Sequence, residues 1–453
     1  MEETADGDDT ASRRRVLAAA AAVASTGVAG CSALGGDGTA TDGDGSDGGD
    51  GTAAGDLESG MSEDGTDTGG DGSNGGTATD GADGGTATSE SAAGDSTATA
   101  GGEAVFPLHR LDAANTADLG RNGPTSEATP AWSVATGNAV FDTPSVAGGT
   151  VYVGSADGTL YALGTDGSER WTYGVNGGIN RTAVGDGVVV GGYVDDGTGY
   201  VGVSTEGSEQ WRVPTDSRPV GAPAIVDGTA YVSEYNGPVH AIDTASGEVD
   251  WTASLATENA STPAVADGTV YVGTLDGVFA LDAATGDRQW HYEAETFVSL
   301  APAVADGAVF FGDRDGNLTA VETDGTERWS IDVDGTIVCS PAVADDLLYV
   351  TLARQDGERL ANTVAAYDIG DSGQSWSTQD GQGVWSSPVV AGELVYAADA
   401  TAGIHAYTAD DGETQWSWSG TDSAAPDIVP APAVTGDTVY VGSYDNSVYA
   451  LRP

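Results

Sequence analysis

Histidine and cysteine, the side chains that most often supply a nucleophile or a metal ligand, are rare and scattered in this chain. The histidines are His109, His240, His291 and His405. Their separation gives no support for a histidine-based metal or general-base site. The cysteines, Cys31 and Cys339, are too few for a disulfide framework. We expect Cys339, at the start of a predicted inner strand, to be a buried structural thiol.

Cys31 has a sequence context that suits covalent modification. Small residues at positions 28–30 precede it, which leaves the peptide bond accessible to a peptidase and the thiol available to a lipid. Upstream, the arginines at 13–15 stand before an apolar stretch, 17–29, that is too short for a convincing membrane span. This order resembles a twin-arginine export signal that ends in a lipobox. We therefore expect residues 1–31 to be a signal peptide and Cys31 to carry a lipid anchor at the extracellular face of the cell membrane; the alternative is that Cys31 is incidental.

Residues 32–103 are composed of Gly, Asp, Thr, Ser and Ala, with almost no large apolar side chain and no base. A segment of this composition cannot bury a core, and we expect a disordered acidic linker.

Acidic residues dominate the whole chain. There are 70 Asp and Glu against 15 basic residues, all of them Arg, and the formal net charge is −55. Such a chain repels itself in dilute buffer, and molar salt screens the repulsion. We interpret the acidity as adaptation to brine, similar to that of haloarchaeal proteins; a cation-binding role is the alternative. Nucleic-acid binding through a basic face is excluded.

One tryptophan recurs about every forty residues from position 132 onward, and the strands around it set the fold. Each interval contains short alternating segments separated by Asp-Gly or Gly-Gly turns, without a helical period. A period of this length with several short strands predicts β-propeller blades. The series is Trp132, Trp171, Trp211, Trp251, Trp290, Trp329, Trp376 and Trp416. We expect these rings to be structural, filling the wedge between neighbouring blades.

The ends of the repeat region predict how the ring closes. Trp132 has no complete unit before it, and the last unit, 432–451, has three strands. The Trp132 segment can supply the missing fourth strand and remove the open edges. The sequence therefore predicts an all-β, eight-bladed propeller of four-stranded antiparallel blades over residues 104–453, closed by its N-terminal strand.

The segment 280–290, ALDAATGDRQW, resembles the tryptophan-docking motif of propellers built from pyrroloquinoline-quinone (PQQ)-type repeats, and 110–116, RLDAANT, resembles their lead-in. The resemblance covers roughly residues 105–453. It implies a PQQ-like propeller, but not an activity, because the family includes both PQQ-dependent alcohol dehydrogenases and non-enzymatic BamB-type assembly lipoproteins.

Departures from the repeat indicate a candidate binding surface. The sixth unit is lengthened near residues 354–362, and the connection after Trp416 is longer than the others. We expect these irregularities to lie on one face, from blade six to blade eight, and to bind a partner; neutral loop drift is the alternative. The residues concerned are Arg354, Arg359, Trp385, Trp418 and Asp427.

A second candidate lies at the mouth of the central channel, before the innermost strands. It comprises Asp142, Asn180 and Arg181. Arg181 replaces the small residue usual at its position and could hold a carboxylate. Pairing with a nearby acid of this chain is the alternative.

The dehydrogenases of the resembled family need a quinone over a tryptophan, a calcium ion, an aspartate base and, in the alcohol-dehydrogenase type, adjacent cysteines. No adjacent cysteines occur here, and no Glu-Asn-Asp calcium set can be placed. We therefore expect no cofactor, and a monomeric, non-catalytic head that binds envelope or membrane proteins of unknown identity. A PQQ-dependent alcohol dehydrogenase of unusual form is the alternative.

Overall fold

The computed structural model describes most of the chain from residue 104 onward: residues 104–106, 112–194, 196–258, 261–294, 296–298, 300–356, 359–378, 386–399, 403–420 and 430–453. The expected signal peptide, the lipidation site at Cys31 and the linker 32–103 lie outside these residues. Within them, no helix has the length and apolar character needed to cross a membrane.

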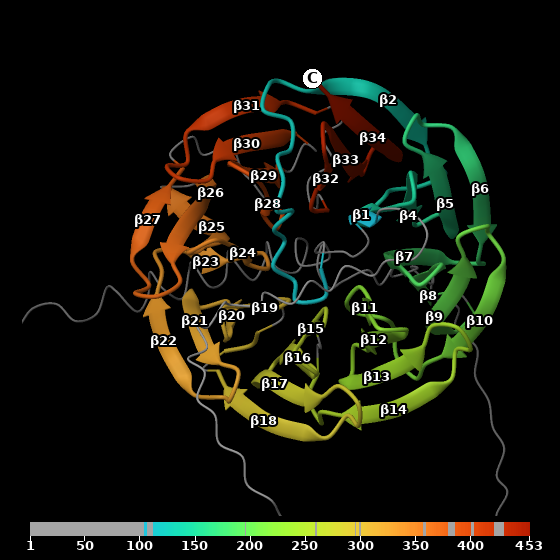
Figure 1. The fold of residues 1–453 in the computed structure, drawn as a ribbon, viewed down its shortest axis with the longest axis horizontal. Coiled ribbons are helices and arrows are strands. Elements are labelled where there is room, and N and C mark those ends of the chain that lie inside the picture. Colours follow the sequence, from blue (N-terminus) through green and yellow to red (C-terminus); the bar gives the residue numbers. More distant parts are fainter. Residues whose placement is uncertain are drawn as a thin grey trace, which may run out of the picture. The chain divides into compact units, whose positions relative to one another are not determined.

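Eight antiparallel sheets are arranged around a central axis, which confirms the predicted eight-bladed propeller (Figure 1). Each blade contains a four-stranded core, and two blades gain a short extra segment. β1 (Ala104–Phe106) adds an inner strand to blade 1, and β23 (Thr336–Ile337) pairs with the second strand of blade 6.

The strands of blades 1 to 4, from the axis outward, are β3 (Ser145–Ala147), β4 (Thr150–Gly154), β5 (Thr159–Gly164) and β6 (Glu169–Gly174); β7 (Gly178–Gly185), β8 (Val188–Val194), β9 (Thr198–Ser204) and β10 (Glu209–Pro214); β11 (Ala224–Val226), β12 (Thr229–Ser233), β13 (Pro238–Asp243) and β14 (Val249–Ser254); β15 (Ala264–Ala266), β16 (Thr269–Thr274), β17 (Gly277–Asp282) and β18 (Arg288–Glu293).

The strands of blades 5 to 8 are β19 (Ala303–Ala305), β20 (Ala308–Gly312), β21 (Asn317–Glu322) and β22 (Glu327–Asp332); β24 (Ala342–Ala344), β25 (Leu347–Asp356), β26 (Arg359–Asp368) and β27 (Gln374–Ser377); β28 (Val389–Ala391), β29 (Leu394–Ala398), β30 (Ile404–Thr408) and β31 (Thr414–Trp418); β32 (Ala433–Thr435), β33 (Thr438–Ser443), β34 (Ser447–Arg452) and β2 (Thr129–Ala135).

The Asp-Gly turns have the backbone that tight hairpins require. Between β15 and β16, Asp267 has φ 47° and Gly268 has φ 74°. Two consecutive residues at positive φ match the twist of the flanking strands, which is why Asp or Asn followed by Gly marks these turns in the sequence.

Each tryptophan of the series joins its blade to the next one. Its indole Nε1 donates a hydrogen bond to a backbone carbonyl at 2.7 to 2.9 Å, and this carbonyl lies in the following blade for every tryptophan except Trp416, whose acceptor is Pro124, before β2. The ring also lies over that blade's turn: a Cβ added to Gly286 would come within 2.6 Å of the Trp251 ring. The acceptors, in order, are Thr165, Thr205, Thr244, Ala283, Thr323, Ile369, Ala409 and Pro124.

The N-terminal strand closes the ring, as predicted. β2 pairs with β34 in antiparallel register, with Trp132 opposite Ala450, and becomes the outer strand of blade 8. Figure 1 shows β2 and β34 side by side at the C-terminus of the chain. Pairing the first long strand with the last one leaves no open edge at the seam between the two ends of the ring.

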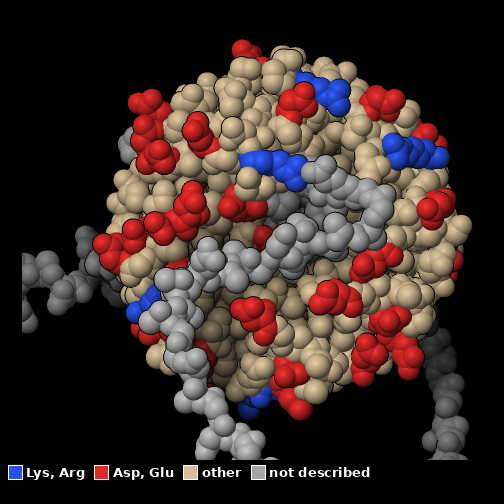
Figure 2. Space-filling model, viewed as in Figure 1, with Lys and Arg blue, Asp and Glu red and all other residues tan. Residues whose placement is uncertain are grey.

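The two faces of the ring differ in the connections that they carry. We call the face that bears the turns between second and third strands, and the connections from each blade to the next, the entry face. The opposite face bears the turns between first and second strands and between third and fourth strands. Acidic side chains are spread around the ring in the view of Figure 2, and arginines are few and separate.

Candidate functional site

The channel-mouth residues come together between blades 1 and 2 on the entry face. The carboxylate of Asp142 is 2% exposed. It accepts hydrogen bonds from the Thr182 backbone N–H (3.0 Å), the Thr182 hydroxyl (2.6 Å) and the Gly154 N–H (3.2 Å). Burial raises the pKa of Asp142 to about 6, although these hydrogen bonds and the nearby Arg181 act in the opposite direction. Asp142 thus joins two blades rather than facing a ligand.

Arg181 has an unusual backbone conformation. It lies within β7, which begins at Gly178, earlier than the sequence suggested, and the register of β7 with β8 shifts between Asn180 and Ala183. Arg181 has φ 56° in this bulge, and its Nη1 donates to Asn180 Oδ1 at 3.0 Å. A positive φ at a non-glycine residue inside a strand is uncommon. The structure therefore places Asp142, Asn180 and Arg181 in one cluster.

Blade 6 carries the largest departure from the repeat. In blade 4 the hairpin of the second and third strands ends with the pair Thr274 and Gly277, whereas in blade 6 the equivalent pair is Leu352 and Thr363. Beyond that pair, β25 and β26 continue through four more pairs, up to Asp356 opposite Arg359. At the rise of a β-strand this adds about 13 Å to the hairpin on the entry face. We call residues 353–362 the blade-6 hairpin.

The root of the blade-6 hairpin is fixed to the rest of the blade. β23 pairs with it, with Thr336 opposite Ala353. Arg354 donates from Nε to the Asp334 carbonyl, and its Nε lies 3.8 Å from the Asp334 carboxylate. Arg354 thus contacts the connection that enters blade 6. Of Arg359 the structure describes only the backbone, within β26.

The other members of the predicted surface are not assembled by the described residues. Trp418 was expected in the connection after Trp416, but it belongs to β31, because the outer strand of blade 7 extends further than the motif indicated. Its ring packs on Tyr449 of blade 8, with centroids 5.6 Å apart. Trp385 and Asp427 lie outside the described residues. Cys339 is buried, as expected.

Two histidines of the entry face pair with acids, and the sequence analysis did not predict these pairs. His240 Nε2 lies 2.6 Å from Glu234 Oε1, and His405 Nε2 lies 2.8 Å from Asp399 Oδ2. Tyr161 donates to Asp157 in the same way in blade 1. The recurrence of an acid in the turn and a ring at the start of the third strand could have been recognised from the repeat. We call such a pair a turn clamp, because it ties the turn between the second and third strands to the third strand. The recurrence indicates this structural role rather than a catalytic dyad.

A cofactor of the PQQ type, which the resembled family implies, does not fit the described channel mouth. At the position of Asp142 the other blades carry Asn180, Gly221, Ser261, Leu300, Cys339, Ser386 and Pro430. Asp142 is the single carboxylate of this set, and three donors already bind it. Among the residues that the structure describes, no three His, Cys, Asp or Glu side chains are grouped to hold a metal ion. Calcium and its quinone would need such a carboxylate and amide set.

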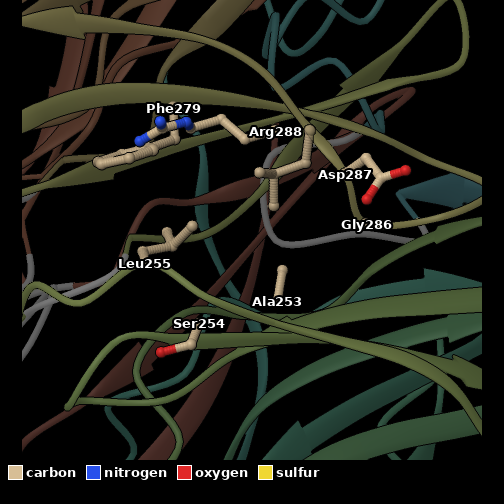
Figure 3. A pocket seen from close by; sticks show the side chains of 8 residues that line it. Ala253, Ser254, Leu255, Phe279, Gly286, Asp287 and Arg288 are labelled. Carbon is tan, nitrogen blue, oxygen red and sulfur yellow. The ribbon is translucent and has the colours of Figure 1, made fainter.

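A cavity of about 220 Å³ lies between blades 3 and 4 (Figure 3). Leu255, at the end of the outer strand of blade 3, lines one side, and Phe279 and Arg288 of blade 4 line the other. Its volume is below the roughly 300 to 1,000 Å³ of typical small-molecule pockets. It is a gap between neighbouring blades, and we do not assign it a ligand.

The fold and its recurring tryptophan contacts define an eight-bladed propeller of PQQ-type repeats. The family model described as "Outer membrane protein assembly factor BamB" matches residues 123–198, 197–330, 280–383 and 357–453, and the chain belongs to this family. Outer membrane protein assembly factor BamB of Escherichia coli (strain K12) is 37% identical over 89 residues, which are 17% of this chain and 23% of that protein. The chain thus spans less than a quarter of the length of the curated relatives that it matches.

Solved structures show the same fold at low identity. BamB from Moraxella catarrhalis is 19% identical with a TM-score of 0.60, over 72% of this chain and 100% of that one. Quinohemoprotein alcohol dehydrogenase from Comamonas testosteroni is 16% identical with a TM-score of 0.60, over 77% of this chain and 80% of that one. An assembly factor and a dehydrogenase thus share this architecture, so the fold alone does not distinguish a scaffold from an enzyme.

Proposed function

We propose that this chain is a non-catalytic protein-interaction scaffold of the cell envelope, with a monomeric head held at the extracellular face of the membrane by a lipid on Cys31. Family membership supports the scaffold role, since the matching model and relative are named as assembly factors. The location is supported by the export and lipidation motifs of residues 12–31. The acidic composition, at −55, suits a head that works in strong brine.

The observation that carries the proposal is the blade-6 hairpin. Its four extra residue pairs are not needed to build a blade, since the other blades form and dock without them. The hairpin root is held by β23 and by Arg354, so the extension starts from a fixed base. A projecting two-stranded element offers backbone donors and acceptors along its edges together with side chains, which is a common means of protein recognition.

The decisive variant shortens this element. Replacing residues 354–361 by Asp-Gly keeps the pair Ala353 and Asn362 and restores a tight turn. Tagged wild-type chain and the shortened variant are used for capture from native membranes in molar salt, with Arg288→Ala, on the side of the ring, as the matched control. We expect a discrete envelope protein with wild type and with the control, and its loss with the shortened hairpin. Equal capture by all three would reject the hairpin as the docking element.

The anchor has its own test. Cys31→Ala removes the thiol that would accept the lipid and leaves the arginines at 13–15 in place. We expect the variant to be exported and recovered in the medium, with wild type in the membrane fraction. Membrane retention of Cys31→Ala at the wild-type level would contradict lipid anchoring.

The alternative function is a quinoprotein alcohol dehydrogenase, a name carried by one of the similar structures. Purified chain in high salt, supplied with PQQ and calcium, tests it directly. A bound chromophore together with dye-linked alcohol oxidation would replace the scaffold proposal. The donor set at the channel mouth leads us to expect neither.

A further inference from the structure

Residues 112–124, which we call the strap, run across the inner rim of the ring before β2 begins. In Figure 1 the segment that precedes β2 crosses the centre of the propeller. Its buried residues alternate along the chain: Ala113, Asn115, Ala117 and Leu119 are all below a tenth exposed. Every second residue of this stretch is thus packed against the blades.

The strap contacts the same position in four consecutive blades. Its backbone carbonyls accept hydrogen bonds from the central valine N–H of the innermost strands β15, β19, β24 and β28. The pairs are Val265 with Ala113, Val304 with Ala114, Val343 with Thr116, and Val390 with Ala117, and the last three are 2.8 Å long. The Leu119 N–H also donates to the Val390 carbonyl at 2.8 Å. The strap is not part of the repeat, yet it accepts a hydrogen bond from the equivalent backbone N–H at the inner edge of each of these four blades.

The path requires an unusual backbone. To meet a new blade every one or two residues, the strap must change direction between successive carbonyls, and it does so at Asn115 (φ 59°) and Ala117 (φ 57°). Asn tolerates this left-handed region, whereas Ala is disfavoured there. Asn115 is further held because its Nδ2 donates to the Pro263 carbonyl at 3.0 Å, and this side chain is 3% exposed.

Both ends of the strap are fixed. At the start, Asp112 accepts from the Thr116 backbone N–H at 2.9 Å and from the Thr116 hydroxyl. At the end, the Pro124 carbonyl accepts from Trp416 and from Tyr396, each at 2.8 Å. In the other seven blades, the tryptophan acceptor is the residue that follows the third strand. In blade 8 that residue is Pro453, and Pro124 of the strap replaces it.

We propose that the strap is a second closure of the ring, independent of the pairing between β2 and β34, and that it holds blades 4 to 7 together through their inner edges. The strap joins the blades near the axis, whereas the tryptophans join them further out. It also lies toward the opposite face, because its contacts flank the turns between first and second strands. This inference does not depend on the proposed function.

The test perturbs the strap in the full chain and follows amide hydrogen exchange in molar salt. Ala117→Val places a β-branched residue at a buried position of positive φ. Asn115→Ala removes the bond to the Pro263 carbonyl and places Ala at a left-handed φ. The matched control, Asp267→Val, imposes the same backbone penalty in an exposed turn of blade 4 that the strap hydrogen bonds do not use. We expect exchange at β19, β24 and β28 to rise on the order of tenfold in both strap variants, with β7 and β11 unchanged. The control leaves β24 and β28 at the wild-type rate.

Uniform acceleration of all eight inner strands would overturn the inference, because the strap would then be an ordinary part of one cooperative core. Wild-type rates at β19, β24 and β28 in both strap variants would overturn it as well. Should Ala117→Val fail to fold, Asn115→Ala alone decides between these outcomes.

Discussion

The indole N–H of Trp416 donates to the carbonyl of Pro124 at 2.8 Å, across 292 positions of the sequence. This bond joins blade 7, the last blade whose four strands are consecutive in the sequence, to the strap that precedes β2. The same carbonyl accepts a hydrogen bond from the Tyr396 hydroxyl. Ring closure therefore depends on side chains of blade 7 as well as on the backbone pairing of β2 with β34.

Trp416→Phe tests this contact. The change keeps a ring in the wedge and removes the donor, and we expect the free energy of unfolding to fall by about 1 to 2 kcal/mol. Trp290→Phe is the control, because its hydrogen bond to the Thr323 carbonyl is exposed to water, and we expect a smaller loss. Denaturant unfolding in molar salt measures both. An equal loss in the two variants would show that the Pro124 contact has no special weight.

The blades and their closure could be predicted from the sequence because side chains of distinctive type mark them. A large ring recurs once per blade, and Asp-Gly pairs mark turns that need positive φ. The strap could not be predicted in this way, since its contacts use backbone carbonyls of small residues such as Ala113 and Ala117. Trp418 was misplaced because nothing in the motif indicates how far an outer strand continues beyond Trp416.

Of the predicted binding surface, the structure shows the lengthened hairpin of blade 6, and its role in binding stays a prediction. The blade-6 hairpin follows from an insertion between two recognisable strands, and its register from their pairing. The cluster of Asp142, Asn180 and Arg181 was expected from the repeat, but its chemistry was not. The sequence shows an aspartate at position 142, but it does not show that the carboxylate is buried and bonded to two blades.

Asp142 gives a pH-dependent prediction. Its pKa is raised to about 6 in the folded chain, above the ordinary value near 4 in the unfolded chain, so folding favours the protonated form. The stabilisation is complete below pH about 4 and is lost as the pH rises through 6. Relative to Asp142→Asn, which does not titrate, wild type should lose up to about 3 kcal/mol between pH 4 and 7.

The matched control for Asp142 is Asp166→Asn. Hydrogen bonds from Ser168 lower the pKa of Asp166, so the sign of its effect is opposite. Unfolding by denaturant across this pH range measures both differences. A pH-independent difference between wild type and Asp142→Asn would mean that Asp142 titrates normally.

The turn-clamp interpretation of His240 predicts which replacement is tolerated. His240→Tyr can still donate to the acid of the turn, as Tyr161 does to Asp157, and we expect stability within about 1 kcal/mol of wild type. His240→Ala leaves Glu234 buried without this partner and should cost about 1 to 3 kcal/mol. Thermal unfolding of the two variants separates the outcomes; equal loss in both would show that the imidazole itself is required.

The charge of the chain predicts a strong dependence on salt. Raising the ionic strength from about 0.1 M to about 1 M shortens the Debye length from about 10 Å to about 3 Å and screens repulsion among the acids. We expect Tm to rise steadily over this range. A similar rise in sodium and potassium chloride would indicate screening, whereas a rise with one cation alone would favour the alternative of specific cation binding.

The most direct test of the scaffold account is photo-cross-linking in native membranes, with the reactive group placed at Asp356 in the blade-6 hairpin or at Asp287 on the side of the ring. The account predicts one discrete adduct with an envelope protein from position 356 and none from position 287. No adduct from 356, or the same adducts from both positions, would contradict it.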